Sequence, residues 1–372
     1  MKTITIGVPC YKAESTLRRL LSSINTQTYK DAITVILSVD NLEEDYSYII
    51  KDYPELCIIQ INNKNGGPGQ ARQKALDKCD TEFITFMDAD DMLADPFTIE
   101  SLMKGFESND IVEIFAPFLQ VGSLNENNER MNRLENNPGH PWVFGRVYRV
   151  KFLRENNIRF PEKLRAMEDG CFNWKIRMLT EGTQWRVGFI QQMVAYCWMP
   201  GSEHSITRIG EKNGIPQYNF DLCQIGAVIA AEEAINFVKE KNPFNTNILQ
   251  FVTEQFVSLF FTYVTCLGRR PEFAKQNMYI ARYFYHKIFK DYSALITDKQ
   301  LEELYTVLLT QKSQEMIGII PEITFHKWLT MVRDYDFDVN EIVQIRQELP
   351  EEIIQNDLKC GVLDESCSLF IK

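Results

Sequence analysis

The chain has 372 residues, 45% hydrophobic and 24% charged, a composition typical of a soluble globular protein with one large domain or two. Its formal net charge of −11 argues against a protein that coats nucleic acid or anionic lipid over its whole surface. Nine cysteines without a C-x-x-C pair, no signal-peptide pattern and no apolar run of about 18 residues predict a cytoplasmic protein with free thiols.

The first third of the chain alternates strand-like and helix-like segments. Strands are predicted at residues 4–8, 33–39, 56–61 and 83–87, because each is rich in β-branched or aromatic residues. Helices are expected between them, the first with Ser15 as its N-cap and a later one after the glycine-rich turn 66–69. This order predicts an α/β fold with a doubly wound, mostly parallel sheet.

The remainder of the chain divides into a polar segment and a helical half. Residues 122–140 are rich in asparagine and are typical of a long loop. Helical patterns dominate after the cluster of Gly210, Gly214 and Pro216, which predicts a boundary. We therefore expect a first domain at 1–210 and a mainly helical domain at 211–372 that serves acceptor binding or assembly.

Three carboxylates, Asp88, Asp90 and Asp91, follow the fourth predicted strand within four positions. Their mutual repulsion has to be offset by positive charge, and Mg²⁺ or Mn²⁺ prefers such oxygen ligands. An acidic turn that caps a helix beginning near Pro96 is the alternative. Asp40 follows the second predicted strand, and parallel strands end at the same edge of a sheet, so the acids are expected to converge there.

Five short motifs follow one another in an order that resembles the family 2 glycosyltransferases of the GT-A fold, over roughly residues 3–207. They are the turn Val8–Glu14, Asp40, the glycine turn Gly66–Arg72, the acids Asp88–Asp91, and the pair Glu168-Asp169. The resemblance implies an inverting, metal-dependent enzyme that moves a sugar from a nucleotide-diphosphate sugar, usually a uridine one. The implied acceptor is a hydroxyl group of a saccharide or glycolipid.

The same resemblance implies roles for individual residues. The donor or nucleotide would be bound by Pro9, Tyr11, Glu14, Asp40, Gly69, Arg72 and Asp88. Mn²⁺ or Mg²⁺ would be held by Asp90, with Asp88 or Asp91, and His204, as further ligands. Ordinary turn chemistry for Glu14, a surface ion pair for Arg72 and a lid or surface loop for His204 remain alternatives. Lys12 and the segment Asn41–Glu44 depart from the family pattern, which leaves the nucleotide open.

Glu168 and Asp169 precede a helix on the acceptor side of the implied fold. Attack by a hydroxyl group needs a carboxylate that takes its proton, and Asp169 is the candidate base, with Glu168 orienting the acceptor. The alternative is two acids that merely favour the positive end of a helix.

A basic stretch with interleaved aromatics, residues 269–290, predicts contact with a membrane surface, an acidic partner or nucleic acid. A helix with a buried aromatic face and a solvated basic face explains the same pattern.

Three other functions are also considered: a glycosyltransferase acting on a hydroxylated DNA base, a non-catalytic nucleotide- or glycan-binding module, and a nucleotidyltransferase. The last would carry a glycine-rich basic loop after the first strand, where this chain has Pro9–Lys12.

Overall fold

The computed structural model describes residues 2–64, 66–124, 130–162, 164, 166–199, 208–212, 215–218, 220–269, 274–311 and 323–334. The chain divides into two compact units, Met1–Asn219 and Phe220–Lys372. At the boundary expected from sequence lies an antiparallel hairpin of β12 (Arg208–Lys212) and β13 (Ile215–Tyr218), which belongs to the first unit. The second unit therefore begins later than residue 211.

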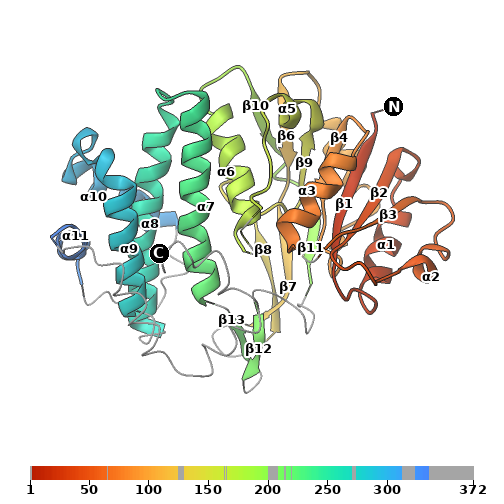
Figure 1. Cartoon of the computed structure of the whole chain (residues 1–372), viewed down its shortest axis with the longest axis horizontal. Helices are drawn as coiled ribbons and strands as arrows, with labels where there is room; N and C mark the ends of the chain where they lie inside the picture. Colours follow the sequence, from red (N-terminus) through yellow and green to blue (C-terminus); the bar gives the residue numbers. More distant parts are fainter. Residues whose placement is uncertain are drawn as a thin grey trace. The chain divides into compact units, whose positions relative to one another are not determined.

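The first unit is built on a seven-stranded sheet with the order β10-β6-β9-β4-β1-β2-β3 (Figure 1). Its strands are β1 (Ile4–Cys10), β2 (Ile33–Val39), β3 (Cys57–Asn62), β4 (Phe83–Phe86), β6 (Ile111–Phe115), β9 (Arg146–Arg149) and β10 (Arg186–Phe189). The strands β1 to β4 pair in parallel, and β9 runs antiparallel between β4 and β6. The predicted mostly parallel, doubly wound sheet is confirmed.

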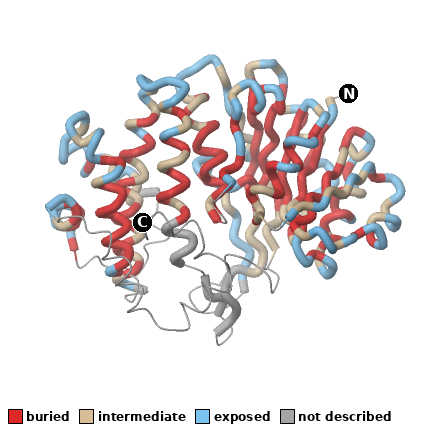
Figure 2. Tube along the Cα trace, viewed as in Figure 1, coloured by how far each residue is buried: buried red, intermediate tan, exposed pale blue. Residues whose placement is uncertain are grey.

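Helices cover this sheet and bury its central strands. They are α1 (Leu17–Asn25), a 3₁₀ turn at Lys30–Ala32, α2 (Ser47–Ile50), α3 (Pro68–Lys78), α4 (Thr98–Lys104), α5 (Val150–Glu155) and α6 (Glu168–Thr180). Helix α3 packs on β1 and β2, α4 packs on β6, and α5 packs on β9. All residues of β4 and β6 are buried, as expected for strands covered on both faces, and Figure 2 shows the same for most of the sheet.

Two local predictions from the sequence are wrong. Thr16, not Ser15, occupies the N-cap of α1, and its hydroxyl donates back to the carbonyl of Ala13 instead of capping the helix. The segment 122–140 is not one long loop, because β7 (Phe118–Leu124) and β8 (Arg130–Glu135) pair antiparallel. Strand β8 lies at the edge of a second sheet, with β5 (Met92–Leu93) and β11 (Tyr196–Trp198), and an exposed edge tolerates polar residues.

The second unit is mainly helical, as predicted. Its helices are α7 (Phe220–Lys241), α8 (Asn247–Arg269), α9 (Ala274–Lys287), α10 (Asp298–Gln311) and α11 (Phe325–Arg333), with short 3₁₀ turns at Phe289–Asp291 and Ser293–Leu295. Residues Asn247–Gly268 of α8 are long and apolar enough to cross a membrane, but 61% of that window is already buried in the structure. Phe256 and Phe260 of α8 lie 5.2 Å and 5.4 Å from the ring of Trp328, so α8 is a core helix of this unit.

Helix α9 contains most of the basic aromatic stretch 269–290. Its aromatic residues Tyr279, Tyr283 and Phe284 are buried, whereas Lys275 and Lys287 are exposed and Arg282 is 7% exposed. Residues 270–273 lie outside the described residues. The described part of the stretch therefore has a buried aromatic face and a solvated basic one, and its rings are not available to stack on bases.

Candidate functional site

Asp40 holds the glycine turn that begins α3. The residue is 5% exposed at the end of β2, and its two carboxylate oxygens accept the backbone N–H groups of Gly66 (2.9 Å) and Gly67 (2.7 Å). Gly67 has a φ of +86°, in the region that favours glycine. Asp40 therefore shapes the loop in front of α3, and its contact with a nucleotide base stays a prediction.

Arg72, on the first turns of α3, lies buried between two acids from distant parts of the chain. Its Nη2 is 2.5 Å from Oδ1 of Asp88, and its Nη1 pairs with Glu168. The side chain is only 4% exposed, so the alternative of a surface ion pair is wrong. The guanidinium joins the acidic turn after β4 to the start of α6.

Gly69 allows this close approach of α3 and α6. A Cβ atom at Gly69 would lie 3.0 Å from Cγ and 3.1 Å from Cβ of Glu168, and 3.2 Å from the carbonyl oxygen of Pro161. A side chain at this position would therefore require Glu168 or the carbonyl of Pro161 to shift. Gly69, predicted as a donor-site residue, thus lies directly against the acid that was predicted to orient the acceptor.

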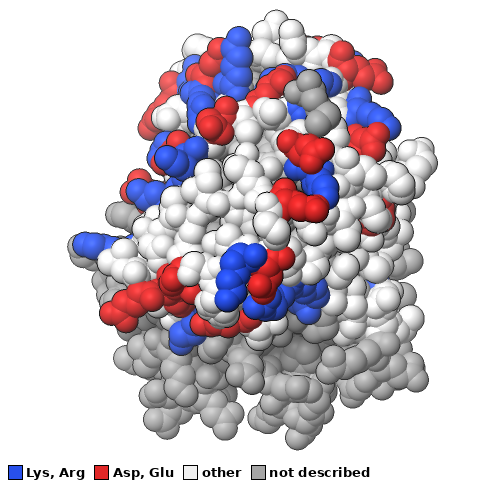
Figure 3. All heavy atoms as spheres, turned by 90° about the vertical axis from the view of Figure 1, so that its right-hand side faces the viewer, with Lys and Arg blue, Asp and Glu red and all other residues white. Residues whose placement is uncertain are grey.

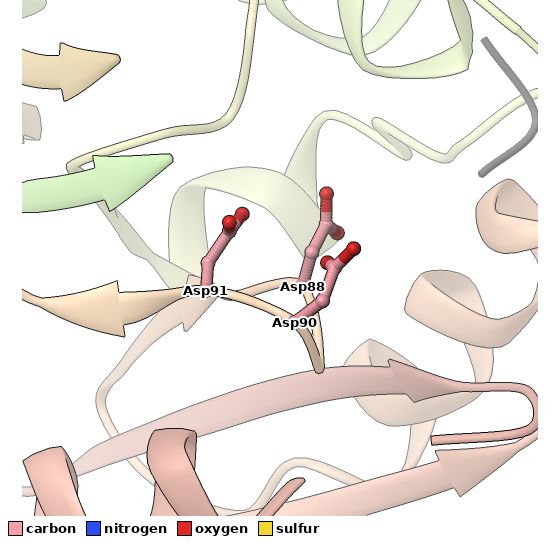
Figure 4. Close-up of side chains that lie close together, drawn as sticks. All are labelled: Asp88, Asp90 and Asp91. Atoms are coloured by element: carbon pink, nitrogen blue, oxygen red, sulfur yellow. The ribbon is translucent and has the colours of Figure 1, made fainter. Parts of the chain in front are cut away.

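The acidic turn lies between β4 and β5. Figure 4 shows the side chains of Asp88, Asp90 and Asp91 rising from one side of the turn, and one carboxylate oxygen from each lies within 4.8 Å of the others. The backbone N–H of Asp91 donates to the carbonyl of Asp88 (3.1 Å), and the guanidinium of Arg19 donates to the carbonyl of Asp90. Asp88 and Asp90 are partly exposed, and their hard oxygen ligands suit a divalent cation.

Asp91 differs from its neighbours because its side chain is fully buried. Its carboxylate accepts hydrogen bonds from the hydroxyl of Tyr196 and from the backbone N–H of Met199 (2.7 Å). Burial, together with repulsion from Asp88 and Asp90, raises the pKa of Asp91 well above its usual range.

Glu168 and Asp169 form the first turn of α6, which follows Met167 in a left-handed conformation (φ +63°). Asp169 is 8% exposed and accepts the backbone N–H of Gly170 (2.8 Å), and the backbone N–H of Val143 also favours its ionised form. Burial raises the pKa of both carboxyl groups, that of Glu168 to about 7, against the opposing attraction of Arg72. A carboxylate with a pKa closer to neutrality is better suited to take a proton from a hydroxyl group.

The turn that contains the predicted residues Tyr11 and Glu14 is held by hydrogen bonds separate from those of Arg72. Tyr11 is 43% exposed and Glu14 is exposed, while Pro9 lies within β1. The backbone N–H of Lys12, whose φ is +49°, donates to the carboxylate of Glu44 (3.0 Å). The departure from the family pattern after Asp40 therefore supplies the acid that holds this turn.

Two residues noted in the sequence lie outside the described residues, and three residues that hold the turns were not predicted from the sequence. His204, the third predicted metal ligand, and Arg165, beside the Glu168-Asp169 pair, lie outside the described residues. Arg19, Tyr196 and Glu44 hold the two turns, and sequence reasoning missed these roles. Their partners are distant in the chain (Arg19 to Asp90 spans 71 positions, Tyr196 to Asp91 spans 105), so no local spacing reveals them.

Comparisons with known proteins agree with this arrangement. Residues 5–173 match the sequence model of the family described as "Glycosyl transferase family 2". Poly(ribitol-phosphate) β-N-acetylglucosaminyltransferase TarS of Staphylococcus aureus is 25% identical over 195 residues, which cover 47% of this chain and 32% of that protein. Poly(ribitol-phosphate) β-glucosyltransferase of Bacillus spizizenii is 26% identical over 184 residues, which cover 45% and 28%. The matched segment thus spans about a third of these relatives.

Solved structures show the same fold. The crystal structure of residues 1–349 of S. aureus TarS in complex with UDP superimposes with a TM-score of 0.60 at 18% identity, covering 94% of this chain and 92% of that one. The corresponding complex with UDP-GlcNAc also gives a TM-score of 0.60, covering 85% and 92%. Together with the family match, this likeness confirms the predicted GT-A fold.

The role of Asp40 predicts a stability loss. Asp40→Ala removes the acceptor of two backbone N–H groups, so we expect the free energy of unfolding to fall by about 2–3 kcal/mol in urea denaturation. Asp45→Ala is the control, because Asp45 is exposed and also accepts a backbone N–H, that of Ser47 (2.9 Å). Equal effects of the two substitutions would contradict the role given to Asp40.

The ion pairs of Arg72 predict a pH dependence. Arg72→Met removes the cation that opposes the raised pKa of Glu168, so this pKa rises further. A carboxyl with a raised folded-state pKa stabilises the fold below its unfolded pKa, and this stability is lost as the pH rises through the folded value. We therefore expect Arg72→Met to lower the free energy of unfolding by about 3–5 kcal/mol at about pH 8 and by less at about pH 6, as measured by chemical denaturation.

The matched control for this substitution is Arg159→Met. Arg159 pairs with Asp77 at 3.1 Å, but both side chains are nearly half exposed, so this change should have little effect and no pH trend. A destabilisation of Arg72→Met that is the same at both pH values would show that Glu168 does not carry the effect.

Proposed function

Since residues 5–173 match the model of glycosyl transferase family 2, we propose that the chain transfers a sugar from a nucleotide-diphosphate sugar to a hydroxyl acceptor. The observation that carries this proposal is Arg72, which holds Asp88 of the acidic turn and Glu168 beside the candidate base in one buried network. A transferase needs both ends of this network, one for the leaving diphosphate and one for the attacking hydroxyl.

We propose a uridine diphosphate sugar as the donor. S. aureus TarS, whose fold this chain shares, has been crystallised with UDP and with UDP-GlcNAc, which supports this choice. For the acceptor we propose a hydroxyl group of a saccharide, a glycolipid or a polyol-phosphate polymer. The names of the relatives that act on poly(ribitol-phosphate) support the last of these.

The acidic turn is proposed to hold Mn²⁺ or Mg²⁺ through Asp90 and Asp88. Their partly exposed oxygens fit a hard divalent cation, which would act as a Lewis acid that offsets the charge of the departing diphosphate. Arg72 already neutralises part of the charge of Asp88, so Asp90 is the stronger candidate for a direct ligand. His204 remains a candidate ligand outside the described residues.

On the acceptor side, Asp169 is proposed to take the hydroxyl proton. The acceptor oxygen then forms a bond to the anomeric carbon, the bond from that carbon to the diphosphate oxygen breaks, and the nucleoside diphosphate leaves. A single displacement of this kind inverts the anomeric centre. Glu168, fixed by Arg72, keeps the first turn of α6 and hence Asp169 in place.

The alternative acceptors and functions gain no support from the described residues. On the face shown in Figure 3, basic and acidic side chains are interspersed, and no continuous basic area covers the described part of that face. The buried rings of α9 also do not suit a protein that tracks DNA. A module that only binds nucleotides or glycans would have no need for the buried acids at the start of α6.

The metal proposal predicts the behaviour of Asp90→Ala. The parent protein should hydrolyse or transfer from one member of a panel of uridine, guanosine and thymidine diphosphate sugars when Mn²⁺ is added. Asp90→Ala should lower that rate by about 10²–10³-fold, because the charge on the leaving group is no longer offset. Asp80→Ala, which removes an exposed acid, should leave the rate unchanged. Silence of the parent across the panel would contradict the proposed function.

The proposed base predicts a different pattern for Asp169→Asn. Transfer should fall by about 10²–10⁴-fold, because the hydroxyl proton has no acceptor. Binding of UDP, measured by isothermal titration calorimetry, should stay close to that of the parent, since Asp169 is not a donor ligand. Full transfer activity in this variant would place the base elsewhere.

A further inference from the structure

The hydroxyl group of Tyr196 holds both ends of the acidic turn. It donates to the carboxylate of Asp91 and accepts the backbone N–H of Asp88 (3.2 Å). The second carboxylate oxygen of Asp91 accepts the backbone N–H of Met199 (2.7 Å). The turn that carries the acids is thus fastened to β11 and to the residue that follows it.

This arrangement separates Asp91 from its two neighbours. Asp88 and Asp90 are partly exposed, whereas Asp91 is 0% exposed and each of its oxygens already has a protein donor. A cation bound to Asp91 would have to enter a position from which solvent is excluded and compete with these donors for the charge of the carboxylate, which is unfavourable for a strongly hydrated divalent cation. The three acids lie close enough to share an ion, but their surroundings suit two of them.

Tyr196 also contacts the acceptor side of the site. Its ring stacks on that of Phe144 at 4.8 Å with an interplanar angle of 17°. Phe144 follows Val143, whose backbone N–H favours the ionised form of Asp169. Tyr196 therefore links the acidic turn to Phe144, the neighbour of a residue that acts on the candidate base.

We propose that Asp91 and Tyr196 are a pair of positioning residues and that Asp91 is not a metal ligand. The pair fixes the turn so that Asp88 and Asp90 present their carboxylates to the cation at a set distance from Asp169. This inference rests on the proposed metal-dependent transferase. It assigns the third acid of the motif to the protein scaffold.

A double-mutant cycle with Mn²⁺ alone tests the pair. Mn²⁺ affinity of the full chain is measured by electron paramagnetic resonance for the parent, Asp91→Asn, Tyr196→Phe and the double variant. We expect each single substitution to weaken Mn²⁺ binding by about tenfold, as for other residues that orient metal ligands. The double variant should bind Mn²⁺ with about the same affinity as either single variant, because both changes break the same contact.

Other results of the cycle overturn the inference. If Asp91 were a direct ligand, Asp91→Asn would weaken Mn²⁺ binding far more than Tyr196→Phe, and the two effects would add. Unchanged affinity in both single variants would overturn the inference alone, leaving the metal-dependent transferase intact. A parent chain that binds no Mn²⁺ would overturn both the metal requirement and this pair.

Two further variants separate positioning from loss of stability. Tyr148→Phe removes another buried hydroxyl, which donates to Asn173 (2.8 Å), and should lower stability in urea without changing Mn²⁺ affinity. Phe144→Leu removes the ring stack with Tyr196 but keeps its hydroxyl bonds, so it should lower kcat severalfold with Mn²⁺ affinity unchanged. If Tyr148→Phe weakened Mn²⁺ binding as much as Tyr196→Phe does, general destabilisation would explain the effect and the inference would fail.

Discussion

The buried ion pairs of Arg72 are the interaction on which the site depends. The guanidinium reaches Asp88, 16 positions away, and Glu168, 96 positions away, and so ties α3, the acidic turn and α6 together. A planar guanidinium can serve two carboxylates at once, which an ammonium group does with less directional control. The features around it support this contact: Asp40 fixes the loop before α3, and Gly69 lets α6 come close.

The electrostatics of the site follow from a surplus of buried acid. Burial raises the pKa of Asp91, Glu168 and Asp169, and the guanidinium of Arg72 offsets only part of this rise for Glu168 and Asp169. A nucleotide diphosphate bound as proposed would bring further negative charge to the same place. The proposed divalent cation would therefore offset negative charge on the exposed side of the turn, where Asp88 and Asp90 lie.

The sequence predicted the parts of the fold that have a regular local pattern. The strands β1 to β4 are apolar runs between turn residues, and the acids follow the ends of these strands. Both the sheet and the position of the acids at its edge were therefore predictable from the sequence. Strand β8 was not predicted, because this exposed edge strand lacks the alternation of apolar and polar residues that indicates a half-buried strand. The partners of Arg72 and the hydrogen bond from Tyr196 to Asp91 were not predicted, because they join residues far apart in the chain. Such pairs have no regular spacing in the sequence that would indicate them.

The position of β9 in the sheet has a consequence for folding. This strand comes late in the first unit, yet it inserts between β4 and β6, and α6 with Asp169 follows it in the chain. The acidic turn and the candidate base therefore meet only after contacts between distant segments have closed, which is the slow part of assembling such a sheet. A partly folded chain with β1 to β4 in place would have the loops proposed to bind the nucleotide but not the candidate base, so the two halves of the proposed site form at different stages of folding.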